Sequence, residues 1–308
     1  MTNILITGGT GFVGSHIINE ITKRDPEVTK IYILSRNPAK ISKKFPKIAN
    51  LLFGFSDFKA LDKKTKFKYI INLAGEPIAE KKWSEKQKEK LRQSRIKTTK
   101  DLVEFIGELA VKPKTLISAS AVGYYGSQDS DELLDEESDF NEEFTHFLCK
   151  DWEDQANLAK NHGVRVCNTR FGIVIGKNGG AVKKMLTPFK FGLGGKIASG
   201  QQAMSWIHMN DLIRAIFFLL ENKILSGVFN FCSPQSVSNE RFTVAFGKAV
   251  SRPTLFNMPL FLVKFLFGEM GETLLAKGQN VYPRRLLEAG FHFRYKKIET
   301  ALRNIVSS

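Results

Sequence analysis

The sequence predicts an α/β protein: a doubly wound parallel sheet with a smaller, mostly helical C-terminal lobe. The chain opens with a short apolar strand over 4–6, a glycine-rich turn and a helix. Strand-like and helix-like segments then alternate to about residue 170, which is typical of parallel strands joined by right-handed crossovers. With 308 residues, 43% of them hydrophobic, the chain is long enough to bury a sizeable core.

The turn after the first strand has the glycine spacing of a dinucleotide-binding loop. Gly11 leaves room for a pyrophosphate, and Gly14 lets the helix pack closely. The helix start offers unpaired N–H groups and the positive end of its dipole to the phosphates. We therefore expect a Rossmann cofactor site made by Gly8, Thr10, Gly11, Phe12, Val13 and Gly14.

The second predicted strand, over 30–34, decides which cofactor we expect. Proteins that prefer the unphosphorylated cofactor usually place Asp or Glu at the end of this strand, on the ribose hydroxyls. This strand ends instead in Ser35 and Arg36, which can bind a 2′-phosphate. The sequence therefore predicts NADP(H) rather than NAD(H), with an ordinary surface arginine as the alternative for Arg36.

Further strands and helices follow in alternation, each predicted from its apolar periodicity. The strands are expected at 51–55, 69–73, 115–118, 164–169 and 228–231, and the helices at 85–109, 143–159 and 212–220. Small residues at Ala74 and Gly75 would let the cofactor lie against the backbone, and Ser120 falls where strand-end hydroxyls face a ligand. Arg95 either points to the cofactor mouth or is one more charge on a basic helix.

After residue 175 the regular alternation of predicted strands and helices is lost. We assign 1–175 to the cofactor domain, to which 207–232 returns, and assign 176–206 and 233–308 to a substrate-side and C-terminal lobe. Phenylalanines are expected to pack this lobe from Pro253 onward, namely Phe256, Phe261, Phe265 and Phe267. Asp211 is expected at the N-cap or in the first turn of the 212–220 helix. Residues 127–143 are expected to form an acidic, irregular and mobile loop.

The net charge of +15 invites a nucleic-acid interpretation. Residues 36–68 hold ten basic and two acidic side chains, 80–100 hold nine and three, and 129–143 hold nine acidic and no basic ones. No helix-turn-helix, zinc finger or stacking motif accompanies the charge. We interpret the lysines as solvated faces that attract an anionic ligand, and expect no specific nucleic-acid partner.

The three cysteines, Cys149, Cys167 and Cys232, form no C-x-x-C pair. They argue for a reducing compartment and against a disulfide framework or a metal site. We expect no signal peptide, because the first apolar run has only three residues, and no apolar run approaches the ~20 residues of a membrane helix. We expect a cytoplasmic protein with a small-molecule substrate and no membrane partner, and leave its oligomeric state open.

Together the motifs resemble the extended short-chain dehydrogenase/reductase family. The resemblance is closest to an atypical branch labelled nucleoside-diphosphate-sugar epimerase, or NAD-dependent epimerase/dehydratase, which carries a small C-terminal domain of unknown function. The matching segments span essentially the whole chain: 7–14, 72–78, 94–95, 123–126, 192–195, 206–208 and 283–286. The resemblance implies NADP contacts at Ser35, Arg36, Leu73, Ala74, Arg95 and Val174.

The chain departs from typical family members at the catalytic residues. Those members use a Ser, a Tyr base and a Lys four residues after the Tyr. Ser120 matches the serine, but no tyrosine here is followed by a lysine at that spacing. Tyr124 or Tyr125 could supply the phenol, with aromatic packing as the alternative. His146 with Lys150 occupies the expected helix, with a surface pair as the alternative.

Trp206 and His208 are the candidates for the substrate pocket, because they precede a helix that the family places beside the cleft. A core histidine is the alternative for His208. Two functions stay open. One is an NADP-dependent epimerase or oxidoreductase acting on a small polar substrate such as a nucleotide sugar. The other is a non-catalytic NADP(H)-binding redox sensor, which the missing Tyr-x-x-x-Lys favours.

Overall fold

Seven parallel strands form the central sheet of the computed structural model, which describes residues 2–25, 27–128 and 131–307. The strands are β1 (Thr2–Thr7), β2 (Val28–Leu34), β3 (Leu52–Phe55), β4 (Phe67–Asn72), β5 (Thr115–Ala121), β7 (Arg165–Phe171) and β12 (Gly227–Phe231). Their order is β12-β7-β5-β4-β1-β2-β3, with every neighbouring pair parallel. The predicted doubly wound parallel sheet is confirmed.

The strand order reverses between β1 and β4. The chain builds outward from β1 to β3, then crosses back to β4 and continues outward on the other side. In sheets of this kind, ligands bind at such a switch point, beyond the carboxyl ends of the strands. The topology therefore predicts a ligand site at the segments that follow Thr7 and Asn72.

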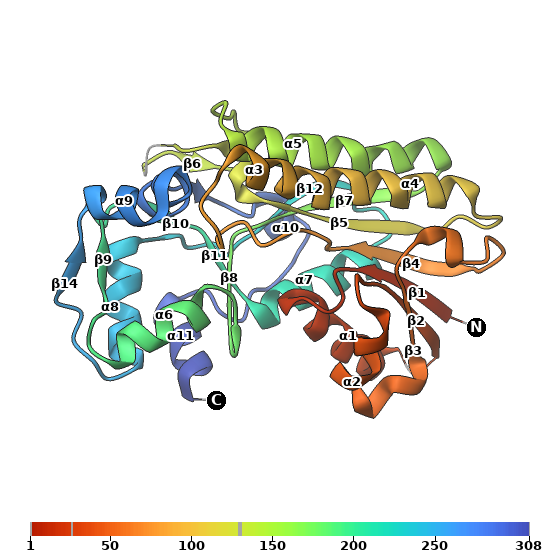
Figure 1. Cartoon of the computed structure of the whole chain (residues 1–308), viewed down its shortest axis with the longest axis horizontal. Coiled ribbons are helices and arrows are strands. Elements are labelled where there is room, and N and C mark those ends of the chain that lie inside the picture. Colours follow the sequence, from red (N-terminus) through yellow and green to blue (C-terminus); the bar gives the residue numbers. More distant parts are fainter. Residues whose placement is uncertain (1, 26, 129–130, 308) are drawn as a thin grey trace.

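Helices cover both faces of the sheet (Figure 1). They are α1 (Phe12–Arg24), α2 (Ile41–Lys44) and α7 (Met209–Glu221) on one face, and α3 (Glu85–Arg92), α4 (Thr98–Glu108) and α5 (Phe144–Asn157) on the other. Because side chains alternate along a strand, Ile4 and Ile6 join the core under α1 and α7, while Leu5 joins the core under α4. The single helix predicted at 85–109 is interrupted by a π-helical turn over Gln93–Lys97.

The rest of the chain forms the smaller lobe and its connections to the sheet. Its helices are α6 (Gly180–Lys190), α8 (Asn239–Ala249), α9 (Leu260–Gly271), α10 (Arg284–Glu288) and α11 (Ile298–Ser307). Short strands pair two by two: β8 (Ile173–Gly176) with β11 (Trp206–His208), β9 (Gly195–Ile197) with β14 (Phe256–Met258), β10 (Ala203–Met204) with β13 (Val237–Ser238), and β6 (Leu133–Leu134) with β15 (Asn280–Val281).

Within the acidic stretch 127–143, residues 131–143 are more ordered than an irregular loop. Leu133 and Leu134 form β6, and the guanidinium of Arg284 pairs with Asp135 at 3.1 Å and Glu137 at 2.6 Å. Residues 129 and 130 lie outside the described residues. The acids of this stretch therefore help to fasten it to the start of α10.

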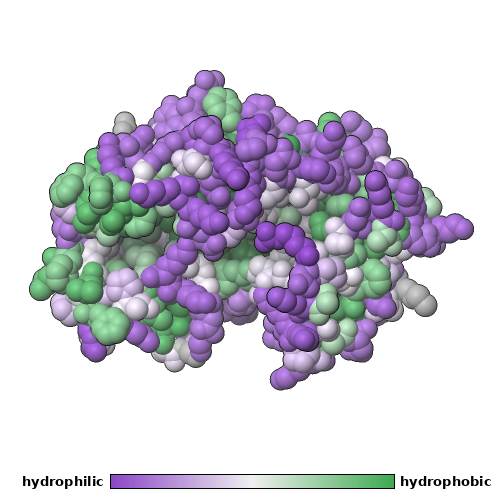
Figure 2. Space-filling view, in the orientation of Figure 1, coloured by the Kyte–Doolittle hydropathy of each residue, from purple (hydrophilic) through white to green (hydrophobic). Residues whose placement is uncertain are grey.

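The phenylalanines after Pro253 do not pack the lobe as predicted. Phe261 is 72% exposed and Phe265 is 76% exposed, and only Phe267 is partly buried. The lobe is packed instead by residues of α6, α8 and α11 together with Trp206, among them Phe189, Phe242, Phe246, Ile298 and Leu302. The exposed phenylalanines belong to a hydrophobic area over α9 and β14 at the left end of the molecule (Figure 2).

Candidate functional site

The glycine loop lies at the switch point and is packed against the end of β4. Gly8 has a φ of +67°, and a Cβ there would lie 2.5 Å from the carbonyl oxygen of Leu73. A Cβ on Gly14 would lie 2.4 Å from the carbonyl oxygen of Gly8. Both glycines are therefore required by the close approach of the protein's own backbone.

Gly11 is a glycine for a different reason. Its φ is −73°, which any residue can adopt, and within 4 Å a Cβ would meet only the Gly8 oxygen, at 3.1 Å. Gly11 is the N-cap of α1, no side chain caps this end, and the first turn holds no acid. The first-turn N–H groups thus face a space that a Cβ would narrow, and this cradle fits the pyrophosphate of a dinucleotide.

Four apolar residues predicted to touch the cofactor surround this loop. Phe12, Val13, Leu73 and Val174 are partly buried and pack against the same core. The Phe12 ring also lies against the turn after β8, since a Cβ on Gly179 would come within 2.2 Å of the ring. The structure therefore brings segments from β1, β4 and β8 together around the loop.

At the end of β2, the side chain of Arg36 is 91% exposed. One of its guanidinium nitrogens lies 3.8 Å from the carboxylate of Glu76, which Lys90 also approaches at 2.9 Å. The hydrogen bond from Lys90 lowers the pKa of Glu76. Ser35 Oγ accepts the N–H of Asn37, so its own hydrogen remains available to donate. The tertiary structure thus supplies an acid beside Arg36 that the sequence around β2 does not contain.

Lys44 is a second cation at the loop that the sequence argument missed. Its ammonium group donates to the carbonyl oxygen of Thr10 from α2. The lysine-rich segment that carries it has no clear periodicity, so only its charge could have pointed to such a contact.

Arg95 lies in the π-helical turn between α3 and α4. Its guanidinium donates to the carbonyl oxygens of Leu91 at 3.2 Å and Glu76 at 2.9 Å, and lies 5.2 Å from the Trp152 ring centre. A Cβ on Gly75 would lie 3.0 Å from Arg95 Cζ. Burial lowers the pKa of Arg95. The side chain therefore points back to the end of β4, and π-turns often occur at functional sites.

A buried polar network connects the ends of β1, β4 and β5. Thr7 donates to Asn72 Oδ1 at 2.6 Å, and the Asn72 amide donates to Thr99 at 2.8 Å and Ser118 at 3.1 Å. The backbone N–H groups of Leu73 and Ala74 donate to the Thr7 hydroxyl. The network fixes the backbone over which the cofactor would lie, and polar residues at the ends of buried strands are the signal that could have revealed it.

Ser120 belongs to a second buried network. Its hydroxyl donates to Glu153 Oε1 at 2.6 Å, and the Glu153 carboxylate is held by Arg170 through bonds of 2.8 and 2.9 Å. Arg170 also donates to the Tyr125 hydroxyl, which donates to Asn230 Oδ1. All five residues are buried. Glu153 and Arg170 were not predicted, because a charged pair inside a fold has no periodicity of its own.

The other proposed proton donors lie above this network. Tyr124 is half-buried, and its ring covers the Arg170 guanidinium at 3.3 Å. His146 is buried, stacks on Phe140 at 3.8 Å and donates Nδ1–H to the Tyr124 carbonyl oxygen at 2.6 Å. Lys150 pairs with Asp154 at 2.7 Å on the exposed side of α5. The structure thus gathers Ser120, Tyr124 and His146, with Tyr124 the most accessible of the three.

Trp206 and His208 both lie in the interior. The Trp206 indole donates to the Gln235 carbonyl oxygen at 3.0 Å. His208, rather than Asp211, is the N-cap of α7, since its Nδ1 accepts the Asn210 N–H at 3.1 Å. Asp211 lies in the first turn and accepts the N–H groups of residues 294 and 295. Burial lowers the pKa of His208 to about 4, so the ring is neutral. These contacts agree with the alternative that His208 is a core histidine rather than a substrate-binding residue.

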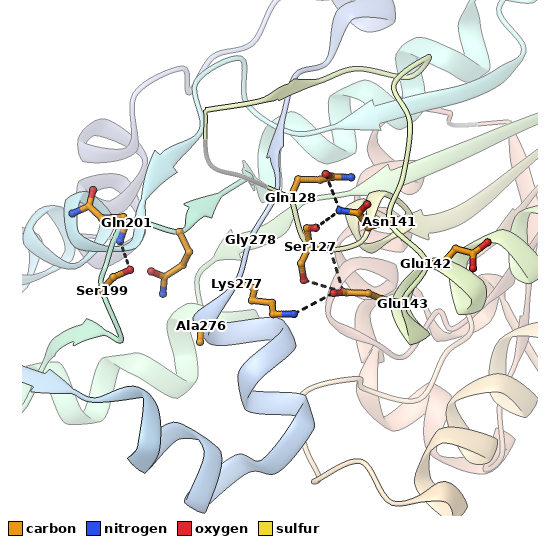
Figure 3. Close-up of a pocket in the computed structure, with 11 residues that line it drawn as sticks. Ser127, Gln128, Asn141, Glu142, Glu143, Ser199, Gln201, Ala276, Lys277 and Gly278 are labelled. Carbon is orange, nitrogen blue, oxygen red and sulfur yellow. Dashed lines mark hydrogen bonds and ion pairs between the residues drawn. The ribbon is translucent and has the colours of Figure 1, made fainter.

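A polar cavity of about 750 Å³ opens between the acidic stretch and the turn after β9 (Figure 3). Glu143, beside the start of α5, accepts from Ser127 at 2.9 Å and pairs with Lys277 at 3.3 Å. Asn141 donates to the Ser127 carbonyl oxygen and to Gln128 Oε1. Amides, hydroxyls and one ion pair suit a polar ligand. None of the residues predicted for the substrate lines this cavity.

The comparisons with known proteins agree with the fold. Residues 4–232 match the NAD dependent epimerase/dehydratase family, and residues 258–305 match a domain of unknown function, DUF1731. The epimerase family protein Mb2239 of Mycobacterium bovis is 38% identical over 299 residues, covering 97% of this chain and 96% of the relative.

Two solved structures extend the comparison. The structure of human epimerase family protein SDR39U1 with NADPH is 30% identical, with a TM-score of 0.89 and full coverage of both chains. The nucleoside-diphosphate sugar epimerase of Corynebacterium glutamicum is 28% identical, with a TM-score of 0.76, covering 99% of this chain and 58% of that one. The chain therefore belongs to the NAD dependent epimerase/dehydratase family, as the resemblance implied.

Proposed function

We propose that this chain binds NADP(H) at the glycine loop and acts as an epimerase or oxidoreductase on a small polar substrate such as a nucleotide sugar. The observation that carries the proposal is the cradle at Gly11, an uncapped helix start that a Cβ would narrow. The NADPH in the human SDR39U1 structure and the name of the Corynebacterium relative support the cofactor and the substrate class.

Each part of the cradle has its own task in this proposal. The first-turn N–H groups of α1 hold the pyrophosphate, and Arg36 turns from Glu76 to a 2′-phosphate. Arg95 and Gly75 flank the end of β4, where the ribose and nicotinamide would lie. When bound, a nicotinamide supplies hydride transfer. Tyr124 is the group that we expect to exchange a proton with the substrate.

A second candidate function, non-catalytic binding of NADP(H), is favoured by one specific observation. The Ser120 hydroxyl donates to Glu153, and the Tyr125 hydroxyl donates to Asn230. The serine that matches the family's, and one of the two tyrosines that could replace its missing phenol, are thus engaged inside the protein. A protein of this kind would report the NADP(H) redox state to a partner.

The experiment that tests the proposal is NADPH binding, followed by turnover, with Gly11→Ala as the diagnostic variant. The added Cβ should weaken NADPH binding by about tenfold or more, because it occupies the space of the pyrophosphate. The free energy of unfolding should change by less than ~1 kcal/mol, since the φ of Gly11 suits alanine. Unchanged NADPH affinity in Gly11→Ala would contradict the proposed site.

Turnover separates the two candidate functions. NADPH absorbance is followed with a panel of carbonyl compounds, and nucleotide sugars are separated from their epimers after incubation with the cofactor-bound protein, using wild type and Gly11→Ala. Oxidation of NADPH, or formation of an epimer without net oxidation of the cofactor, by wild type alone supports the enzyme. Tight NADPH binding without turnover of any substrate leaves the non-catalytic candidate.

A further inference from the structure

A group of large apolar side chains is exposed at the end of the lobe that carries α9. We define this apolar end by its residues: Phe191, Leu193, Leu255, Phe256, Leu260, Phe261, Phe265 and Leu266. Leu255 is 86% exposed and Phe191 is 76% exposed. Single exposed apolar residues are ordinary, but a group of this kind marks an interaction site.

The residues of the apolar end come from three segments that contacts hold beside one another. Arg252 Nε donates to the Lys190 carbonyl oxygen at 3.0 Å, which holds the segment before β14 against the end of α6. Phe256 of β14 pairs with Gly195 of β9. Met258 is followed by Pro259, the N-cap of α9. Figure 2 shows the resulting hydrophobic surface over α9 and β14.

The helix α9 presents its aromatic side chains outward. Val263 and Met270 are buried, whereas Phe261 and Phe265 stand four residues apart on the exposed face. The helical φ and ψ values are interrupted at Gly268, so the apolar part is a short helix that lies along the surface. In the described ranges no helix is long and apolar enough to cross a membrane.

The segments that carry the apolar end are strongly basic. Residues 177–198 contain five lysines and no acidic residue, and residues 248–268 contain two lysines, one arginine and no acidic residue, before Glu269 and Glu272. Lys264 lies between the two phenylalanines and pairs with Glu272 at 2.9 Å, and Lys82 donates to the Phe265 carbonyl oxygen at 3.0 Å. The cofactor site lies at the switch point and does not account for this local surplus of positive charge.

We propose that the apolar end is a docking surface for an anionic lipid bilayer. Exposed phenylalanines and leucines enter the bilayer interface, and the surrounding lysines contact the anionic headgroups. The charge argues against a second copy of the chain as the occupant, because two identical basic surfaces would repel each other. The proposal departs from the expectation that the chain has no membrane partner, and it does not depend on the proposed function.

Co-sedimentation of the full chain with lipid vesicles tests the proposal. Wild type should sediment with phosphatidylcholine vesicles that contain phosphatidylglycerol, and much less with pure phosphatidylcholine. The double variant Phe261→Ser, Phe265→Ser should bind the anionic vesicles at least about tenfold more weakly, because two large apolar side chains are lost from the interface. The matched control is Val111→Ser with Ile224→Ser, which removes two exposed apolar side chains from the other part of the molecule.

Three results would overturn the proposal. One is a wild-type chain that sediments with neither kind of vesicle. Another is a double variant that binds as well as wild type while its circular dichroism is unchanged. The third is a wild-type chain that is a dimer in light scattering and binds no vesicles, together with a double variant that is a monomer. The occupant of the apolar end would then be a second copy of the chain.

Discussion

The carboxyl ends of β1 and β5 lie at the same edge of the sheet, but the polar groups that follow β1 lack side-chain partners, whereas those of β5 are buried and bonded. After β1, no side chain caps the first N–H groups of α1, and a Cβ on Gly11 would meet only the Gly8 carbonyl oxygen within 4 Å. At the end of β5, the Ser120 hydroxyl is buried and donates to the Glu153–Arg170 pair. The proposed cofactor half of the site is thus formed by backbone that is already in position, whereas side chains occupy the hydroxyl in the half that would carry out the chemistry.

The largest expected effect comes from disrupting the buried network around Ser120, which is the closed half of the site. Glu153→Ala leaves the Arg170 guanidinium buried without its carboxylate, and the pair's side chains are only 6% and 3% exposed. We expect the free energy of unfolding to fall by about 3–5 kcal/mol, measured by denaturant titration.

Asp154→Ala is the matched control, one residue along the same helix. It breaks the exposed Lys150–Asp154 pair and should cost less than ~1 kcal/mol. Equal losses in the two variants would mean that the Glu153–Arg170 network does not set the stability of this edge.

The next effect concerns the end of β11, where His208 is also closed to solvent. The pKa of His208 in the folded chain is about 4, below the ordinary value of 6.5. Between these two pH values the unfolded chain therefore binds a proton at His208 that the folded chain does not. Stability is therefore complete above pH 6.5 and is lost as the pH falls towards 4, by up to about 3 kcal/mol.

His208→Asn should remove this pH dependence, since asparagine is also a good N-cap and does not titrate. Unfolding titrations of wild type and variant across this pH range measure the difference. The exposed His292→Asn is the control and should leave the wild-type profile unchanged. Parallel profiles for wild type and His208→Asn would refute the role of His208.

The smallest expected effect concerns cofactor binding at the open half of the site. Arg36→Glu replaces the exposed cation at the end of β2 by an anion and should weaken NADPH binding by about 10–100-fold, as for the loss of a charge-assisted hydrogen bond. NADH affinity should change little, because NADH lacks the 2′-phosphate. Fluorescence titration measures both affinities, with Arg303→Glu on α11 as a control of equal charge change. Equal loss of NADPH and NADH binding would exclude the 2′-phosphate role.

The sequence by itself determined the sheet and the cofactor half of the site. Strands have a short apolar period, helices have a longer one, and the glycines of the loop stand at a fixed spacing after β1. Local signals of this kind are enough to place Gly11 and Arg36 at the ends of β1 and β2. They did not reveal the π-turn that aims Arg95, which shows as an interruption only in the folded helix.

Only the tertiary structure decided the surroundings of the predicted residues. It placed Glu76 beside Arg36, enclosed Ser120 with Glu153 and Arg170, and buried Trp206 while leaving Phe261 and Phe265 exposed. An apolar residue in a short helix has no sequence mark that says whether another element will cover it. The polar partners come from segments far apart in the chain, so their pairing depends on the strand order rather than on any local pattern.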